Sequence, residues 1–156
     1  MPKTSAGLIL YREMGGKLEV LLVHPGGPLW AKKDTGVWSI PKGELDEGQP
    51  GGDYLATAKR EFAEETGFPP PTGEFISLGS ITQKGGKIVH AWACKGDVDT
   101  KAIKSNKFSM EWPPRSGREQ LFPEIDRGEF FAIEEAKQKI NPAQIDFLLR
   151  LQEAAG

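Results

Sequence analysis

The first hydrophobic positions of the chain fall into two runs that a glycine-containing turn separates. Residues 5–13 and 17–25 are rich in leucine, isoleucine and valine, and Met-Gly-Gly-Lys at 14–17 joins them. Such runs predict strands, and the paired glycines favour a hairpin turn between them. We therefore expect two paired strands at the start of the chain.

A long segment rich in glycine and proline follows at residues 26–53, and its pattern is too irregular for a long helix or strand. Within it, the sequence favours a short strand at 37–40. Loops of this length usually serve a function in addition to connecting two elements. We therefore look for functional residues in this loop and beside it.

A helix is predicted to run from Asp53 to about Thr66. Asp53 is a suitable N-cap, and Gly67 is a suitable terminator because glycine readily adopts the left-handed conformation that often ends a helix. The apolar positions with helical spacing are Leu55, Ala58 and Phe62. This spacing gives the helix one face that can be buried.

The rest of the chain adds further strands and then helices. In chain order we expect strands at 74–83 and 87–98, a strand near 129–132, and helices at 133–140 and 142–153. Asn141 would cap the last helix and Pro142 would fill its first position. Strands first, one helix among them and helices last predict an α+β domain on a mixed sheet. The length predicts a single domain over residues 1–156.

Composition narrows the class of partner. The 20 Lys and Arg residues nearly balance the 22 Asp and Glu residues, and the net charge of −2 provides no overall attraction to nucleic acid or an anionic membrane. The single cysteine, Cys94, excludes an intramolecular disulfide and suits a reducing compartment. Hydrophobic runs are too short to span a bilayer. We expect a cytoplasmic monomer or homodimer that binds no membrane and no nucleic acid.

Three glutamates crowd one side of the predicted helix. Glu61, Glu64 and Glu65 fall within an arc of about 100° at helical spacing, beside the apolar face. Like charges at this spacing cost a few tenths of a kcal/mol, so an unpaired cluster needs compensation. Mg²⁺ prefers carboxylate oxygens and could supply it. The alternative is a solvated acidic face that Lys59 and Arg60 balance.

The residues around these glutamates resemble a known family. Residues 43–68 are similar to the signature of the Nudix hydrolases: Gly, five residues, Glu, seven residues, Arg-Glu, an apolar residue, any residue, Glu-Glu, any residue, Gly and an apolar residue. Residues 60–68 match every specified position. The first half departs, because Gln49 stands where the signature has Glu and ten residues separate it from Arg60. We interpret this as a three-residue insertion, and Glu47 could replace the missing acid.

The resemblance implies a Nudix α/β/α sandwich and hydrolysis of a nucleoside diphosphate linked to another group, with Mg²⁺ or Mn²⁺ as cofactor. Carried over by position, Glu61 and Glu65 would bind metal, and Glu64 would be a further ligand or the base that aligns water. The Lys42 carbonyl would be a backbone ligand. Arg60 would pair with the helix acids and support the site.

Nudix enzymes often take another catalytic carboxylate from a late loop. In residues 116–126 the resemblance makes Glu119 the first candidate and Glu124 the second, with a surface acid as the alternative for each. His24 and His90 could assist proton transfer, but a structural role at strand ends suits them better.

The substrate is predicted from two further likenesses. Residues 37–43 are similar to the tryptophan-containing approach in diadenosine tetraphosphate hydrolases of this family, which favours cleavage of a dinucleoside polyphosphate to mononucleotides. Residues 111–124 look more like a bacterial subgroup of nucleoside triphosphate pyrophosphohydrolases. A nucleotide-binding module without catalysis is a further alternative because of Gln49. RNA cap removal is weaker, since no basic stripe is visible.

Several side chains are candidates for contacts with the nucleotide. Lys42, Lys33 and Arg118 could bind phosphates, and an exposed tryptophan could stack on a base. Trp38 is the preferred tryptophan, and it lies within residues 37–43, the segment that resembles the diadenosine tetraphosphate hydrolases. The other three tryptophans are Trp30, Trp92 and Trp112. Packing in the core or at its rim is the alternative for each.

Overall fold

The long leucine- and valine-rich runs form the centre of a mixed sheet. The computed structural model describes residues 3–45 and 53–155. Within these residues six strands form one sheet, in the order β4-β5-β1-β2-β8, with β3 paired to β1. The six strands are β1 (Thr4–Met14), β2 (Lys17–Pro25), β3 (Lys42–Glu44), β4 (Ile76–Thr82), β5 (Ile88–Lys95) and β8 (Ile125–Ala132). Strands β1 and β5 run parallel and the other pairs are antiparallel.

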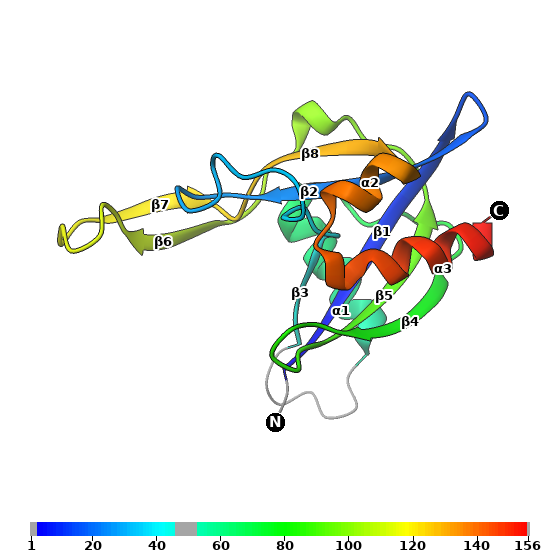
Figure 1. The fold of residues 1–156 in the computed structure, drawn as a ribbon, viewed down its shortest axis with the longest axis horizontal. Helices are drawn as coiled ribbons and strands as arrows, with labels where there is room; N and C mark the ends of the chain where they lie inside the picture. Colours follow the sequence, from blue (N-terminus) through cyan, green and yellow to red (C-terminus); the bar gives the residue numbers. More distant parts are fainter. Residues whose placement is uncertain (1–2, 46–52, 156) are drawn as a thin grey trace.

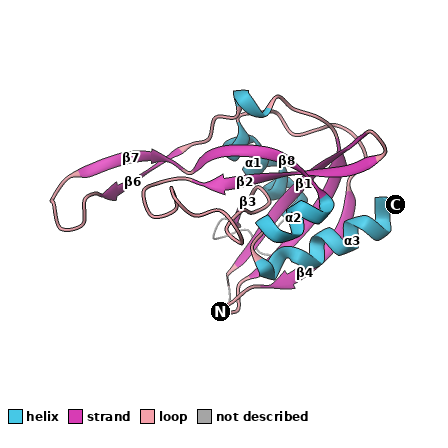
Figure 2. Cartoon of the chain, turned by 45° about the horizontal axis from the view of Figure 1, so that its top comes forward, coloured by secondary structure: helices cyan, strands magenta, loops and turns pink. Residues whose placement is uncertain are grey.

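Helices cover both faces of this sheet (Figures 1 and 2). Helix α1 (Tyr54–Thr66) buries Ala58 and Phe62 against one face, together with Leu8 of β1. Helices α2 (Ile133–Lys139) and α3 (Ile145–Ala155) cover the other face, where Phe147 packs in the same cluster as Ile9. Successive residues of β1 therefore enter different cores, as the alternation of side chains along a strand requires. The result is the expected α+β sandwich with a mixed sheet.

The ends of α1 agree with the sequence prediction. The Asp53 side chain accepts a hydrogen bond from the Ala56 N–H at 3.0 Å. At the other end Gly67 has a φ of 81°, and its N–H donates to the Ala63 carbonyl at 2.8 Å. Both caps are local interactions between residues close in sequence, which is why the sequence identifies them.

Residues 107–123 differ from the irregular segment that the sequence suggests. They form a two-stranded ribbon of β6 (Lys107–Glu111) and β7 (Glu119–Pro123), and Figure 1 shows it extending away from the sheet. Phe108 and Met110 alternate with polar residues along the short strand β6, but β7 has no such alternation, so the sequence signal for the ribbon is weak. None of residues 107–123 is buried. The proline and glycine residues that suggested irregular chain lie at its turn.

Two smaller predictions are corrected. Residues 37–40 are not a strand but make isolated bridges, one of them between Val23 and Ser39. The last helix starts later than predicted, because a 3₁₀ turn, η2 (Pro142–Gln144), precedes α3. Asn141 caps this turn by accepting from the Ala143 N–H at 3.0 Å. A further 3₁₀ turn, η1 (Thr100–Ala102), follows β5. Across residues 3–45 and 53–155, no helix has the length and apolar character required to cross a membrane.

Candidate active site

The acidic face of α1 meets the backbone of β3 at Gly43. A Cβ atom on Gly43 would lie 2.1 Å from the Glu61 Cδ, so the Glu61 carboxylate fills the space that any other residue would need. One residue earlier, the Lys42 N–H donates to Glu65 Oε1 at 3.2 Å. The short strand and two of the three glutamates are therefore in direct contact.

Negative charge is unfavourable on Glu65 in the absence of a cation. The pKa of its carboxyl is raised to about 8, mainly by burial and also by the nearby carboxylates of Glu61 and Glu124, while the N–H and ammonium groups of Lys42 act in the opposite direction. Burial also lowers the pKa of the Lys42 ammonium to about 8, together with the positive charge of Lys87. A divalent cation would lower the pKa of Glu65 again, because it favours the ionised carboxylate.

Arg60 contacts the other acids of the helix. Its Nη1 lies 3.3 Å from Glu61 Oε1 and 3.3 Å from Glu64 Oε2. The guanidinium is about two-fifths exposed, so the ion pairs stabilise the helix only slightly. The ion pairs also affect geometry, since the planar guanidinium with its fixed donor directions restricts where the two carboxylates can point. This arrangement agrees with the supporting role that the resemblance implies.

Glu124 adds a carboxylate that does not come from α1. It immediately precedes β8 and lines a cleft together with Lys42 and Glu65. Burial raises the pKa of Glu124, and the Glu64 carboxylate raises it as well. Repulsion between carboxylates therefore links Glu124 to Glu64 and Glu65, and Glu65 to Glu61.

The structure places Glu119, the first candidate for the late catalytic acid, away from the cleft. Glu119 lies on β7, where its Oε2 accepts a hydrogen bond from Ser109 Oγ at 2.7 Å across the ribbon. It does not line the cleft, whereas Glu124 does. The sequence could not separate the two, because the point at which the chain leaves the ribbon and rejoins the sheet is set by strand pairing.

The cleft between β2, β3 and β8 has a volume of about 210 Å³. Its walls combine apolar side chains with the charged groups of the site. The lining residues are Val23, Pro25, Val37, Ser39, Ile40, Lys42, Glu65, Glu124 and Ile125. A cleft of this kind can hold an apolar ring system on one side and phosphate groups on the other.

Trp38 has no ring face available for stacking on a base, which corrects the prediction of a substrate contact. Its side chain is 1% exposed, and its indole N–H donates to Asp34 Oδ1 at 2.7 Å. The ring packs edge-on against His24 and Phe131, with ring centroids 5.1 and 4.9 Å away. Trp38 is thus a core residue that anchors the loop leading to β3.

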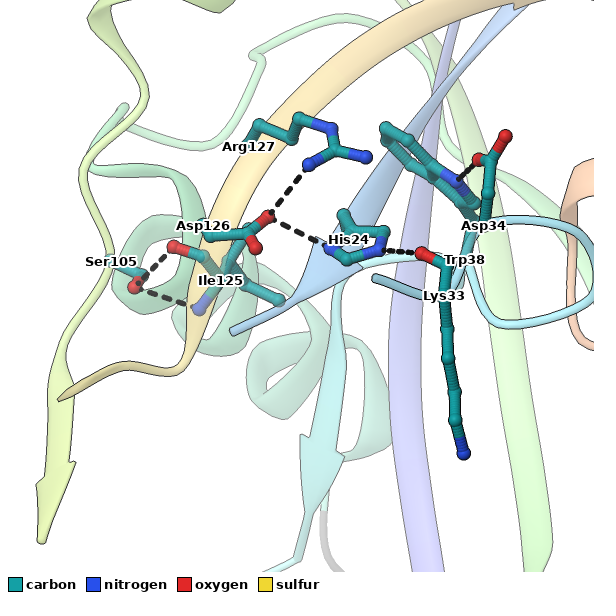
Figure 3. Close-up of polar contacts among 8 residues, drawn as sticks. All are labelled: His24, Lys33, Asp34, Trp38, Ser105, Ile125, Asp126 and Arg127. Atoms are coloured by element: carbon teal, nitrogen blue, oxygen red, sulfur yellow. Dashed lines mark hydrogen bonds and ion pairs between the residues drawn. The ribbon is translucent and has the colours of Figure 1, made fainter. Parts of the chain in front are cut away.

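His24 connects this loop to β8, as Figure 3 shows. The buried ring donates from Nε2 to the Lys33 carbonyl at 2.6 Å, and Nδ1 lies 2.9 Å from Asp126 Oδ1. His90 stacks on Tyr54, with ring centroids 4.4 Å apart, and burial lowers its pKa. Both histidines make the structural contacts that the sequence favours for them.

Gln144 is a residue of this region that sequence reasoning missed. It is fully buried, its Oε1 accepts from the Ile40 N–H at 3.1 Å, and its Nε2 donates to Ser39 Oγ at 3.1 Å. These bonds hold the segment that enters β3. The sequence signal was a glutamine in an otherwise apolar helical face, but Ile40 and Ser39 lie more than a hundred residues away in the chain.

The remaining predicted positions lie outside the cleft or outside the described residues. Lys33 is exposed, with its ammonium 5.1 Å from the centroid of the Trp30 ring. Arg118 is exposed on the ribbon, where its carbonyl accepts from the Trp112 N–H at 3.0 Å. Gln49 and Glu47 lie outside the described residues.

Comparisons with known proteins place this geometry in a family. A family model described as NUDIX domain matches residues 1–151. A search of curated proteins gives no match. Among solved structures, a C. elegans Ap4A hydrolase in a binary complex has a TM-score of 0.65 at 24% identity, covering 97% of this chain and 96% of that chain.

Two further structures show the same architecture. The NUDIX domain of Shewanella oneidensis NrtR, crystallised with ADP ribose, has a TM-score of 0.65 at 16% identity and covers 100% of this chain and 90% of that chain. A mutT/nudix family protein from Listeria innocua has a TM-score of 0.63 at 20% identity and covers 99% and 95%.

At these identities the likeness defines the class of fold, a mixed central sheet between helices of the Nudix type. The match to the family model over residues 1–151 goes further, and the chain belongs to the NUDIX domain family. It is a hydrolase that acts on pyrophosphate bonds in nucleotide derivatives. The resemblance carried by residues 60–68 is thereby confirmed.

Nudix hydrolases generally use divalent metals, and the residues of this site fit one. The fit rests on the donor set: carboxylates of Glu61, Glu64, Glu65 and Glu124 that repel one another, and the close approach of Glu61 to Gly43. Among residues 3–45 and 53–155, no three acidic, histidine or cysteine side chains already converge into a metal site. Ligand side chains would therefore have to adjust on binding.

Proposed function

We propose that the protein is an Mg²⁺- or Mn²⁺-dependent pyrophosphohydrolase of nucleoside polyphosphates. The preferred substrate is a dinucleoside polyphosphate such as diadenosine tetraphosphate, cleaved to mononucleotides. The observation that carries the proposal is the contact of Glu61 and Glu65 with the Lys42–Gly43 backbone at the edge of a cleft. Such a site places acidic ligands beside a space that can receive phosphates.

Each acidic residue has a role in this proposal. Glu61, Glu65 and the Lys42 carbonyl would hold the metal, and Glu64 would be a further ligand or the base that orients the attacking water. When bound, the metal neutralises phosphate charge and lowers the pKa of water. Glu124 lines the cleft together with Glu65, near enough to Glu64 for the two charges to interact, and would bind metal or accept a proton. Arg60 restrains Glu61 and Glu64.

Lys42 would bind substrate phosphate with its ammonium group. Its side chain lines the cleft beside Glu65, and its pKa near 8 leaves it mostly charged at neutral pH. The apolar walls contributed by Val23, Ile40 and Ile125 would exclude water from one nucleoside. The substrate preference is supported by the Ap4A hydrolase neighbour at 24% identity and by the likeness of residues 37–43 to that group.

A second candidate substrate is a nucleoside triphosphate, cleaved to a monophosphate and pyrophosphate. It is favoured by residues 111–124, which resemble the triphosphate pyrophosphohydrolase subgroup and form the turn and second strand of the ribbon. The proposed metal site is the same for both substrates. The two substrates differ only in the group that lies beyond the scissile phosphoanhydride bond. We also propose a cytoplasmic location, which suits the buried and unpaired Cys94.

Turnover of a nucleotide panel in water labelled with heavy oxygen tests the proposal, because it reports both the substrate and the phosphorus attacked. Glu65→Gln should lower the rate with Mg²⁺ by about 100-fold or more. Glu135→Gln, on the exposed side of α2, is a matched control that should retain the wild-type rate. Equal rates for wild type and Glu65→Gln would contradict the assigned role of Glu65.

A further inference from the structure

A second, smaller pocket lies between the loop after β2 and the root of the β6–β7 ribbon. Its volume is about 90 Å³, and we call it the side pocket. The lining residues are Gly26, Gly27, Leu29, Trp30, Phe108 and Met110. All of them are apolar residues or glycines, and they come from two segments that are far apart in sequence.

The side pocket adjoins the active-site cleft. Pro25 lines the cleft and Gly26 lines the side pocket, so consecutive residues border both spaces. The Gly26 N–H donates to the Glu124 carbonyl at 2.8 Å, and Glu124 also lines the cleft. A Cβ on Gly26 would lie 2.0 Å from the Pro123 carbonyl oxygen, so glycine permits this close approach of the two segments.

Large apolar side chains remain exposed around the side pocket. Trp30 is 38% exposed and Leu29 is 58% exposed. The Lys33 ammonium lies 5.1 Å from the centroid of the Trp30 ring. An aromatic surface with a flexible cation beside it suits a ligand that carries both a flat ring and phosphate charge.

We propose that the side pocket and the Trp30 ring bind the second base of a dinucleoside polyphosphate, while the cleft holds the scissile phosphates and the first nucleoside. The inference rests on the proposed function. It assigns Lys33 to the distal phosphates, with Trp30 and Leu29 forming the apolar platform. The flat base stacks on the exposed rim, since the pocket itself accommodates only one edge of it. A ligand with one base, seated in the cleft, leaves this surface without a base.

Calorimetry in the presence of Mg²⁺ tests this assignment with two non-cleavable ligands: methylene-bridged diadenosine tetraphosphate and methylene-bridged ATP. In Trp30→Ala, the loss of affinity for the two-base ligand should exceed the loss for the one-base ligand by about tenfold. Trp30→Phe retains a ring and should restore most of the difference. Leu121→Ala is the matched control, because Leu121 is 68% exposed on the opposite face of the ribbon.

Each outcome decides between the inference and its alternatives. Equal losses for both ligands, or no loss for either, would overturn the second-base site and leave Trp30 as packing for the ribbon root. Wild type that binds both ligands equally would overturn it as well. These results leave the proposed hydrolysis intact, because binding is measured without cleavage. Absence of turnover on every nucleotide with Mg²⁺ would instead remove the proposed function and the second-base site with it.

Discussion

The backbone N–H of Lys42 donates a hydrogen bond to Glu65 Oε1 at 3.2 Å and joins β3 to the end of α1. The bond holds one carboxylate oxygen against the strand beside the cleft. Because the same carboxyl group is buried near Glu61 and Glu124, its ionisation depends on what else occupies the site. This relationship links the stability of the metal-free protein to pH.

The stability of the metal-free protein should fall as pH rises from 4.5 toward about 8. Folded Glu65 keeps its proton up to a pKa of about 8, whereas the unfolded chain loses it near 4.5, so the unfolded state gains in this window. The slope from this group is at most about 1.4 kcal/mol per pH unit. The pKa of Lys42 is lowered to about 8, so its own effect changes only above that pH.

Urea unfolding with a chelator, at several pH values within this window, measures the effect. Glu65→Gln should flatten the dependence, and excess Mg²⁺ should oppose the fall by favouring the ionised carboxylate. An equally steep fall in Glu65→Gln would assign the dependence to another group.

Gly43→Ala should damage the site through Glu61. The added Cβ would lie 2.1 Å from the Glu61 Cδ, so the carboxylate must leave its place. We expect a loss of about 1–3 kcal/mol of folding stability and a larger relative loss of turnover. Gly73→Ala is a suitable control, because its Cβ would lie at an ordinary 3.5 Å from Cys94 Sγ. Unfolding curves and steady-state rates together separate the two effects.

Glu124→Gln should lower kcat/KM by at least about tenfold, because it removes a carboxylate that lines the cleft with Glu65. Glu119→Gln should stay within about twofold of wild type, since this side chain contacts only the ribbon within the described structure. Parallel kinetics at saturating Mg²⁺ compare the two variants. A reversed order would restore Glu119 as the late acid.

Trp38→Ala should unfold at lower denaturant concentration, with a loss of about 3–5 kcal/mol, because it empties a fully buried site. Trp38→Phe keeps most of the packing but removes the donor to Asp34, so its free energy of unfolding should lie between those of wild type and Trp38→Ala. A large rise in KM with unchanged stability would instead indicate direct contact with the nucleotide.

The sequence by itself determined the elements whose causes are local. The caps at Asp53 and Gly67, the shared face of the three glutamates and the β1–β2 hairpin all depend on residues within a few positions of one another. The match over residues 60–68 identified the family for the same reason, since its spacing is that of one helix.

Only the tertiary structure decided the features that join distant segments. The sequence placed Glu119 ahead of Glu124 and Trp38 in the substrate site, but strand pairing carried Glu119 onto the ribbon and packing placed Trp38 in the core. The contact of Gln144 with Ile40 likewise depends on how the chain returns across the sheet. The positions of these residues follow from burial and hydrogen bonding between distant segments, which the spacing of residues along the chain does not specify.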